Sequence, residues 1–108
     1  MLELGLEFLH VTGMLAVFPE LAAMVDVPQD PHWHPEGDVW THTLMVVDAA
    51  AGLRDGGEDD LALMFAALCH DFGKPETTVT GEDERIRSPQ HDVAGERMAL
   101  EFLAAMRA

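Results

Sequence analysis

The sequence predicts an all-α protein built as one domain, and three observations support this prediction. Apolar residues recur every three or four positions along several stretches, which is the spacing of one helix face. A clean alternation of apolar and polar residues, typical of half-buried strands, is not found, and the chain has no tyrosine. Its 108 residues suffice for one modest hydrophobic core but not for a second catalytic module.

Composition indicates a globular protein and argues against polyanionic partners. Hydrophobic residues make up 48% of the chain, and the longest apolar run, residues 61–69, is half a membrane span. With 20 acidic and 6 basic residues the formal net charge is −14, so we expect no autonomous binding to nucleic acid and no membrane association. The first residues include Glu3 and Glu7 and no basic segment, which predicts a cytoplasmic protein without a signal peptide.

Five helices are predicted along the chain. The first begins at Leu2 and ends before Gly13, and a short second helix begins at Pro19 and ends near Met24. Residues 27–38 contain three prolines and one glycine, so they form a loop. These boundaries divide the single domain, 1–108, into N-terminal helices (1–26), a Pro-rich loop (27–38) and a core (39–108).

The third helix is predicted for residues 38–53, with Asp38 as its N-cap. Its buried stripe contains Val39, His42, Val46, Ala49 or Ala50, and Leu53. After two glycines, a fourth helix is predicted for residues 58–71. Its buried stripe contains Leu61, Phe65, Leu68 and Phe72.

Gly73 and Pro75 are expected to end the fourth helix. The polar residues 74–90 form a surface loop or a poor hairpin. The last helix begins at His91 or Asp92. Its apolar stripe repeats every four residues and contains Ala94, Met98, Phe102 and Met106.

Three of the six histidines, His42, His70 and His91, fall on inward stripes of these helices. A buried imidazole needs partners for its ring nitrogens, and three that converge with a carboxylate form a donor set suited to a divalent transition metal. Asp71 supplies the carboxylate, because two neighbouring side chains at a frayed helix end can reach one ion. Any one of these histidines alone is more often a satisfied core or surface residue, so the hypothesis depends on their convergence.

The other histidines and the single cysteine are predicted to have no part in catalysis. His32 and His34 lie in the Pro-rich loop, where we favour local packing or contacts at the rim of the site over ligation of the metal. His10 is given no role. Cys69 lies in an apolar run, so it is interpreted as a core residue rather than a nucleophile.

Several sequence blocks, in a fixed order, are similar to those of known proteins. They are His42, the segment Cys69-His70-Asp71-Phe72-Gly73-Lys74, and His91. In these blocks the chain resembles the HD superfamily of metal-dependent phosphohydrolases. The resemblance is narrower still to the HD domain of bacterial multifunctional tRNA nucleotidyltransferases, the CCA-adding enzymes, and it covers most of the chain. The blocks shared with that domain are 18–21, 27–29, 33–38, 42–45 and 65–74.

The resemblance implies an HD-domain helical bundle that hydrolyses phosphomonoesters or 2′,3′-cyclic nucleotide phosphodiesters. It implies a divalent metal ion (magnesium, manganese, cobalt or nickel) with His42, His70 and Asp71 as ligands. Lys74 is then expected near the substrate phosphate, although a cation that complements a helix C-terminus is an equal alternative. His91 either completes the coordination or contacts the phosphate, and we favour the contact. The predicted catalytic residues are therefore Asp71, His70, His91 and Lys74.

Two departures from the family pattern lead to further expectations. The family's last metal-ligand aspartate has no counterpart after Asp71, and residues 87–90 stand where the family often has more histidines, so one weakly held ion is expected. The alternative function is a non-catalytic helical module that serves dimerisation or tRNA placement. Because the family's later helices are lacking, Met98, Phe102 and Met106 are expected to be uncovered, which predicts a homodimer.

Overall fold

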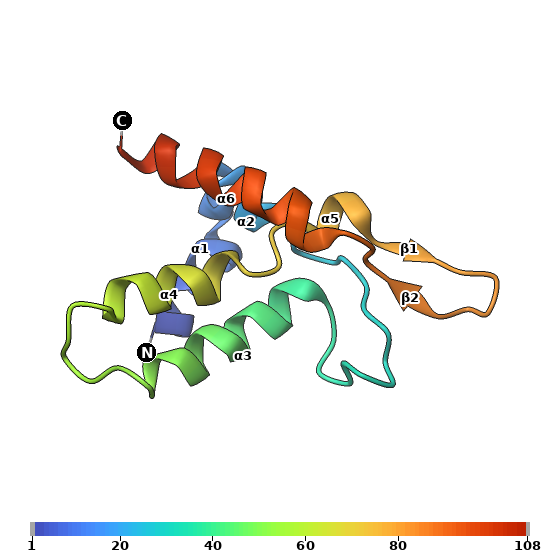
Figure 1. Ribbon diagram of the computed structural model, residues 1–108, viewed down its shortest axis with the longest axis horizontal. Coiled ribbons are helices and arrows are strands. Elements are labelled where there is room, and N and C mark those ends of the chain that lie inside the picture. The colour runs from blue at the N-terminus through green and yellow to red at the C-terminus, as the bar shows by residue number, and fades with distance from the viewer. Residues whose placement is uncertain (1, 108) are drawn as a thin grey trace.

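The computed structural model describes residues 2–107, and it confirms the all-α prediction (Figure 1). The elements, in chain order, are α1 (Leu2–Thr12), the 3-10 helix η1 (Met14–Val17), α2 (Pro19–Ala22), α3 (Val39–Ala51), α4 (Asp60–Cys69), α5 (Lys74–Thr77), β1 (Val79–Thr80), β2 (Ile86–Arg87) and α6 (His91–Arg107). All five expected helices are present, and η1 and α5 are additional. Residues 74–90 contain α5 and a short antiparallel hairpin, β1–β2.

Asp38 caps α3, as the sequence predicts. Its Oδ1 accepts a hydrogen bond from the Thr41 backbone N–H at 2.9 Å, which satisfies an amide that the helix N-terminus would leave unpaired. Its Oδ2 accepts a second hydrogen bond, from the Asp26 backbone N–H at 2.6 Å. Asp38, the last residue of the Pro-rich loop, is therefore hydrogen-bonded to Asp26, the residue just before the loop begins.

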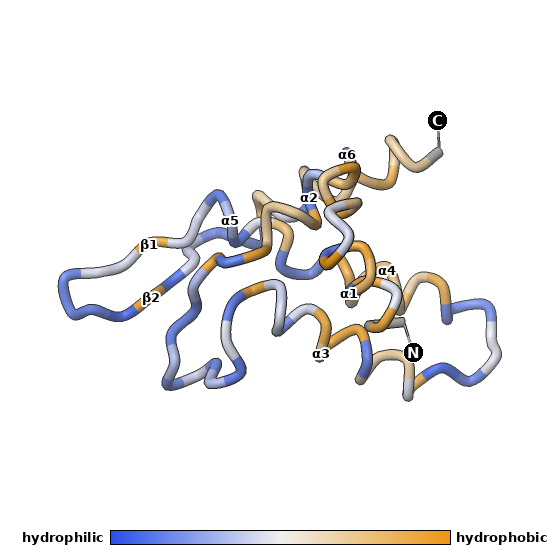
Figure 2. The backbone as a smooth tube through the Cα atoms, turned by 180° about the vertical axis from the view of Figure 1, so that it is seen from behind, coloured by the Kyte–Doolittle hydropathy of each residue, from blue (hydrophilic) through white to orange (hydrophobic). Residues whose placement is uncertain are grey.

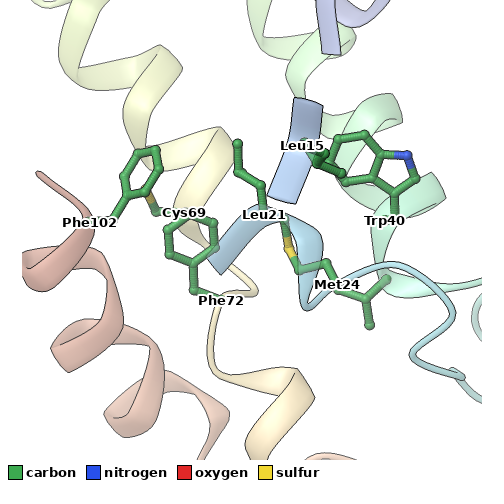
Figure 3. Close-up of a cluster of buried hydrophobic side chains, with 8 residues drawn as sticks. Leu15, Leu21, Met24, Trp40, Cys69, Phe72 and Phe102 are labelled. Atoms are coloured by element: carbon green, nitrogen blue, oxygen red, sulfur yellow. The ribbon is translucent and has the colours of Figure 1, made fainter. Parts of the chain in front are cut away.

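The main hydrophobic core joins the N-terminal helices to α6 and to the turn after α4. Its buried side chains are Leu15, Leu21, Met24, Val39, Trp40, Cys69, Phe72 and Phe102. Phe72 is fully buried, and its ring meets that of Phe102 edge-on at 5.2 Å between centroids, a favourable arrangement for aromatic pairs. Figure 3 shows Cys69 beside these two rings. The core thus fixes the residue that follows Asp71.

The predicted buried faces of two helices need correction. On α3 the buried side chains are Val39, Trp40, Thr43, Val47 and Ala50, so the face is rotated from the predicted stripe. Ala49 and Leu53 are exposed, and Val46 and His42 are only partly buried. On α4, Leu61 is exposed. Both helices carry apolar residues on more than one face, so the spacing alone could not select the face that packs.

The last helix, α6, folds back over the core of its own chain. Figure 1 shows it along one side of the molecule, with α3 on the opposite side and α4 between them. Phe102 is buried, Met98 is partly buried and packs on the core, and Met106 is exposed. The expectation that this stripe is uncovered is therefore wrong for Phe102 and Met98, because Phe18 and Phe72 cover Phe102. The homodimer stays a prediction, but an uncovered apolar stripe on α6 no longer supports it.

The molecule measures 46 × 29 × 29 Å, and its hydrophilic segments lie towards both ends of the long axis. Figure 2 shows hydrophobic backbone segments concentrated in α1, α3 and α4, and hydrophilic ones in the Pro-rich loop, around the hairpin and in the loop between α3 and α4. The Pro-rich loop and the hairpin lie at the same end of the long axis (Figure 1). None of the helices described within residues 2–107 is long and apolar enough to cross a membrane.

Candidate metal centre

Asp71 lies in the turn that follows α4 and is the centre of the candidate site. The helix ends at Cys69, two residues before the predicted end, so Asp71 and His70 belong to the turn rather than to the last helical turn. The backbone N–H of Phe72 donates to the Cys69 carbonyl at 3.1 Å, and that of Lys74 donates to the Asp71 carbonyl at 3.0 Å. These tight turns place Phe72 in the core while Asp71, also buried, contacts the histidines.

Gly73 brings this turn against the start of α6. A Cβ atom at this position would lie 1.9 Å from the His91 carbonyl oxygen and 2.6 Å from the Gly95 nitrogen, separations that a side chain cannot adopt. The contact is therefore one of backbone against backbone, and glycine is required for it. It places His91 next to Asp71. Gly95 was missed by the sequence analysis, because a glycine within a helical pattern gives no sign of a close contact.

The predicted site residues converge on the carboxylate of Asp71. Its Oδ2 atom lies 2.9 Å from His70 Nε2, 3.3 Å from Lys74 Nζ and 3.7 Å from His42 Nε2. Its Oδ1 atom lies 3.6 Å from His91 Nε2. Nevertheless Oδ2 is buried, and no donor among the residues that the structure describes is aligned to form a hydrogen bond with it. A buried polar atom left in this state is costly unless a proton or a cation satisfies it.

The far nitrogens of two imidazoles show where their protons lie. His70 Nδ1 is 2.7 Å from the Ala67 carbonyl oxygen, and His91 Nδ1 is 3.0 Å from the Ser88 carbonyl oxygen. A carbonyl oxygen can only accept, so each Nδ1 carries a proton and donates it. In the neutral rings the Nε2 atoms then hold the lone pairs, and these face Asp71.

A second carboxylate, Glu36, orients His42 in the same way. Its Oε2 atom accepts hydrogen bonds from His42 Nδ1 at 2.6 Å and from His34 Nδ1 at 3.1 Å. His42 Nε2 is thereby left with its lone pair on the side of Asp71. Glu36 lies in the shared block 33–38, but no role was predicted for it. Residues in a loop have no periodic spacing that would reveal their neighbours.

This donor set fits a divalent cation. His42, His70 and Asp71 each offer one ligand atom, and these three atoms lie within 4.8 Å of one another. Ring nitrogens and a carboxylate oxygen that face each other without a proton between them are mutually repulsive, and a cation would turn this repulsion into coordination. His91 is outside this group and faces the other oxygen of Asp71, so both of its predicted roles stay predictions.

The contact between His70 and Asp71 affects the pKa of both groups in the ion-free site. Burial alone would raise the pKa of the Asp71 carboxyl, but the neighbouring His70 and Lys74 outweigh burial and lower it to about 2. The contact with Asp71 in turn raises the pKa of His70, although burial of the ring opposes this. A cation needs the lone pair of the neutral His70 ring, so binding of the ion and protonation of His70 compete.

Of the residues that were given no catalytic role, His34 contacts Glu36 and the His42 ring, whereas His10, His32 and Cys69 have other partners. His10 and His32 pack edge-on against Trp40 and Trp33, respectively. Burial, with a smaller effect from Glu20, raises the pKa of the Cys69 thiol to about 11, which agrees with its interpretation as a core residue.

Comparison with known proteins supports the family that the sequence blocks suggested. The chain is 43% identical over 107 residues to a multifunctional CCA protein from Halorhodospira halophila (strain DSM 244 / SL1). It is 40% identical over 101 residues to a multifunctional CCA protein from Actinobacillus pleuropneumoniae serotype 5b (strain L20). The alignments cover 95% and 93% of this chain but 24% of each relative, so the chain spans about a quarter of their length.

No solved structure matches the chain. The family described as "HD domain" matches residues 39–107, a segment that contains every predicted site residue from His42 to His91. Since this match covers well over half of the sequence, the chain belongs to the HD domain family.

Proposed function

We propose that the chain is a metal-dependent phosphohydrolase that acts on phosphomonoesters or on 2′,3′-cyclic nucleotide phosphodiesters. The observation that carries this proposal is the buried Asp71 Oδ2 atom, which has no aligned donor and faces the Nε2 atoms of His42 and His70. Membership in the HD domain family supports the same chemistry. Magnesium, manganese, cobalt and nickel are the candidate ions.

His42, His70 and Asp71 would hold the ion. A divalent cation bound there supplies a nucleophile by lowering the pKa of a coordinated water, and it neutralises charge on the phosphate. The hydrogen bonds from each Nδ1 atom keep the ring planes fixed, so little reorganisation accompanies binding of the ion.

Three groups of the chain would act on the substrate itself. The Lys74 ammonium, which lies 3.3 Å from Asp71 Oδ2, would contact phosphate oxygens and balance their charge. His91 lies on the side of Asp71 Oδ1 and would hold another phosphate oxygen there if its Nε2 atom also carries a proton, because a phosphate oxygen accepts a hydrogen bond from an N–H group. The Oδ1 atom would also accept a proton from the attacking water as its oxygen bonds to phosphorus. The ester P–O bond breaks and the leaving alcohol oxygen takes up a proton, so no covalent intermediate is needed.

The test is hydrolysis of p-nitrophenyl phosphate and of adenosine 2′,3′-cyclic monophosphate with each of the four ions. We expect activity that requires an added ion, that is lost in Asp71→Ala and His70→Ala, and that is retained in Glu82→Ala, a matched acidic control on the exposed hairpin tip. Ion binding without hydrolysis of either ester would contradict the proposal. It would favour the non-catalytic helical module.

A further inference from the structure

A small cleft opens beside the candidate metal centre, where three segments distant in the sequence meet. Its volume is about 170 Å³. The Pro-rich loop contributes Trp33 and His34, α5 contributes Lys74, and the hairpin contributes Ile86 and Ser88. The cleft therefore exists only in the folded chain, and Lys74 is the one lining residue to which a mechanistic role is assigned above.

A buried carboxylate holds the walls of the cleft together. Asp30 is buried, and its side chain accepts a hydrogen bond from the His32 backbone N–H at 2.9 Å and pairs with the guanidinium of Arg85 from the hairpin. The Asp30 carbonyl accepts hydrogen bonds from the backbone N–H groups of Trp33 and His34, at 3.1 and 2.8 Å. The backbone beneath Trp33 is therefore fixed by the protein before any ligand arrives.

The Trp33 indole is left largely open on this fixed backbone. It is 70% exposed, whereas Trp40, the other tryptophan of the chain, is buried in the core. The His32 ring meets the Trp33 indole edge-on, at 4.8 Å between centroids. An exposed indole on a rigid loop is an unfavourable use of a large apolar side chain unless something packs on it.

Lys74 connects the cleft to the candidate metal centre. Its Nζ atom donates to Gln29 Oε1 at 2.7 Å, which holds the ammonium at the wall of the cleft, and the same atom lies 3.3 Å from Asp71 Oδ2. A phosphate held beside Asp71 would therefore contact Lys74. Whatever group is esterified to that phosphate would extend into the cleft, towards Trp33.

We propose that this cleft binds the nucleobase of a nucleotide substrate, with Trp33 stacked on the base and Lys74 on the phosphate. The proposal rests on the phosphohydrolase function proposed above and names its substrate-binding subsite. A cleft of about 170 Å³ accommodates one planar heterocycle. An uncharged base is also not repelled by the net charge of −14, and stacking on indole selects for a flat ring rather than for one particular base.

The first measurement locates the ligand by tryptophan fluorescence, with magnesium present because that ion does not quench indole. Adenosine 5′-monophosphate should quench the exposed Trp33 in a saturable way, whereas ribose 5-phosphate, which lacks only the base, should leave the emission unchanged. Quenching that is equal for the two ligands, or absent for both, would overturn the proposal.

The second measurement compares the affinities of variants by equilibrium dialysis. Trp33→Ala should weaken binding of adenosine 5′-monophosphate by roughly tenfold to a hundredfold, and binding of ribose 5-phosphate by less than about twofold. Trp33→Phe, which keeps an aromatic face, should restore most of the loss. Leu53→Ala is the matched control, since Leu53 is equally exposed, at 72%, and lies outside the cleft.

The two proposals fail in distinguishable ways. If both esters are hydrolysed but Trp33→Ala binds adenosine 5′-monophosphate as the unaltered chain does, the subsite is wrong and the phosphohydrolase stands. If binding depends on the base and on Trp33 but no ester is hydrolysed with any ion, the subsite stands and the catalytic function is wrong.

Discussion

Asp71 and Glu36 both lie among imidazole rings, yet their carboxylates are satisfied in different ways. Glu36 Oε2 accepts ring N–H groups from His34 and His42, at 3.1 and 2.6 Å. Asp71 Oδ2 is buried without an aligned donor and faces the Nε2 atoms of His42 and His70. Judged by distance alone, the two groups are equivalent, because in each of them the possible ligand atoms lie within 4.8 Å of one another.

Both carboxylates are close to histidines, so proximity does not distinguish them. The positions of the protons do: they show which carboxylate can bind a metal ion and which one only orients a histidine that binds it. In the Glu36 group both ring nitrogens that face Oε2 donate to it, so protons already lie where a cation shared by these three atoms would bind. In the Asp71 group, which consists of His42, His70 and Asp71, the protons of the neutral rings lie on the far side, where they are hydrogen-bonded to Glu36 and to the Ala67 carbonyl oxygen. Glu36 is therefore a positioning residue, and Asp71 is the expected ligand.

The largest expected effect is on metal binding by Asp71→Ala. The affinity for manganese or cobalt should fall by more than about a hundredfold, because a ligand is removed rather than one of its supports. The helical content should be retained, since Asp71 lies in a turn after α4 and its Oδ2 atom holds no aligned hydrogen bond. Calorimetric titration and circular dichroism measure the two quantities. An unfolded variant would show that Asp71 mainly maintains the fold.

The next largest effect is expected for Gly73→Ala. This substitution should move the turn that carries Asp71 away from α6, and it should leave the hydrogen bonds of Glu36 intact. A methyl group cannot fit 1.9 Å from the His91 carbonyl oxygen, so the turn and α6 must separate, at a cost of about 3 kcal/mol in unfolding free energy. Urea denaturation measures this loss. Gly5→Ala is the control, because a Cβ at Gly5 on α1 meets no atom within 4 Å. Equal stability of the two variants would contradict the backbone contact.

Glu36→Ala should weaken metal binding less than Asp71→Ala does, by roughly tenfold to a hundredfold, as is usual for residues that orient a ligand. Glu36→Gln should reduce the affinity for the ion by less than Glu36→Ala does, because the amide oxygen of glutamine still accepts a hydrogen bond from one ring N–H. Nitrogen NMR of the ion-free protein should find the proton of His42 on Nδ1, and should find this preference lost in Glu36→Ala.

The control for Glu36 is Glu76→Ala, at an exposed carboxylate that pairs with Arg97 on the surface. It should bind the ion as the unaltered chain does. Two ions bound per chain, of which one is lost in Glu36→Ala, would mean that Glu36 is itself a ligand. The distinction between the two carboxylates would then be wrong.

The smallest effect concerns stability against pH in the ion-free protein. The pKa of Asp71 is lowered from 3.8 to about 2, so its ionised form contributes about 2 kcal/mol to stability above pH 3.8, and this is lost as the pH falls towards 2. The pKa of His70 is raised from 6.5, so the contribution of its protonated form is present below that value and is lost as the pH rises through the raised one.

The His70–Asp71 pair should therefore stabilise the fold most in the window between these two pKa values. Urea unfolding at about pH 3 and at about pH 5 should show a gain in stability for the unaltered chain that is much smaller in Asp71→Asn. An equal gain in both proteins would show that other carboxylates determine the stability in acid.

The sequence by itself determined the helices, the family and the residues of the Asp71 group. Apolar spacing located five helices, and Asp38 was identified as a cap because capping depends on residues close in the chain. His42, the His70-Asp71 pair, Lys74 and His91 were recognised from blocks in a fixed order, and the structure places all of them within 3.7 Å of the Asp71 carboxylate.

Only the tertiary structure decided which faces pack, how the histidines are protonated and what surrounds the site. Helices that are apolar on several faces can pack in more than one way, so α3 turned Val47 inward and left Leu53 exposed. Glu36 and Trp33 lie in a loop, where function depends on contacts with distant segments rather than on a repeat along the chain. Neither the tautomer of His42 nor the cleft below Trp33 can be predicted from spacing, because both arise from atoms that meet only after folding.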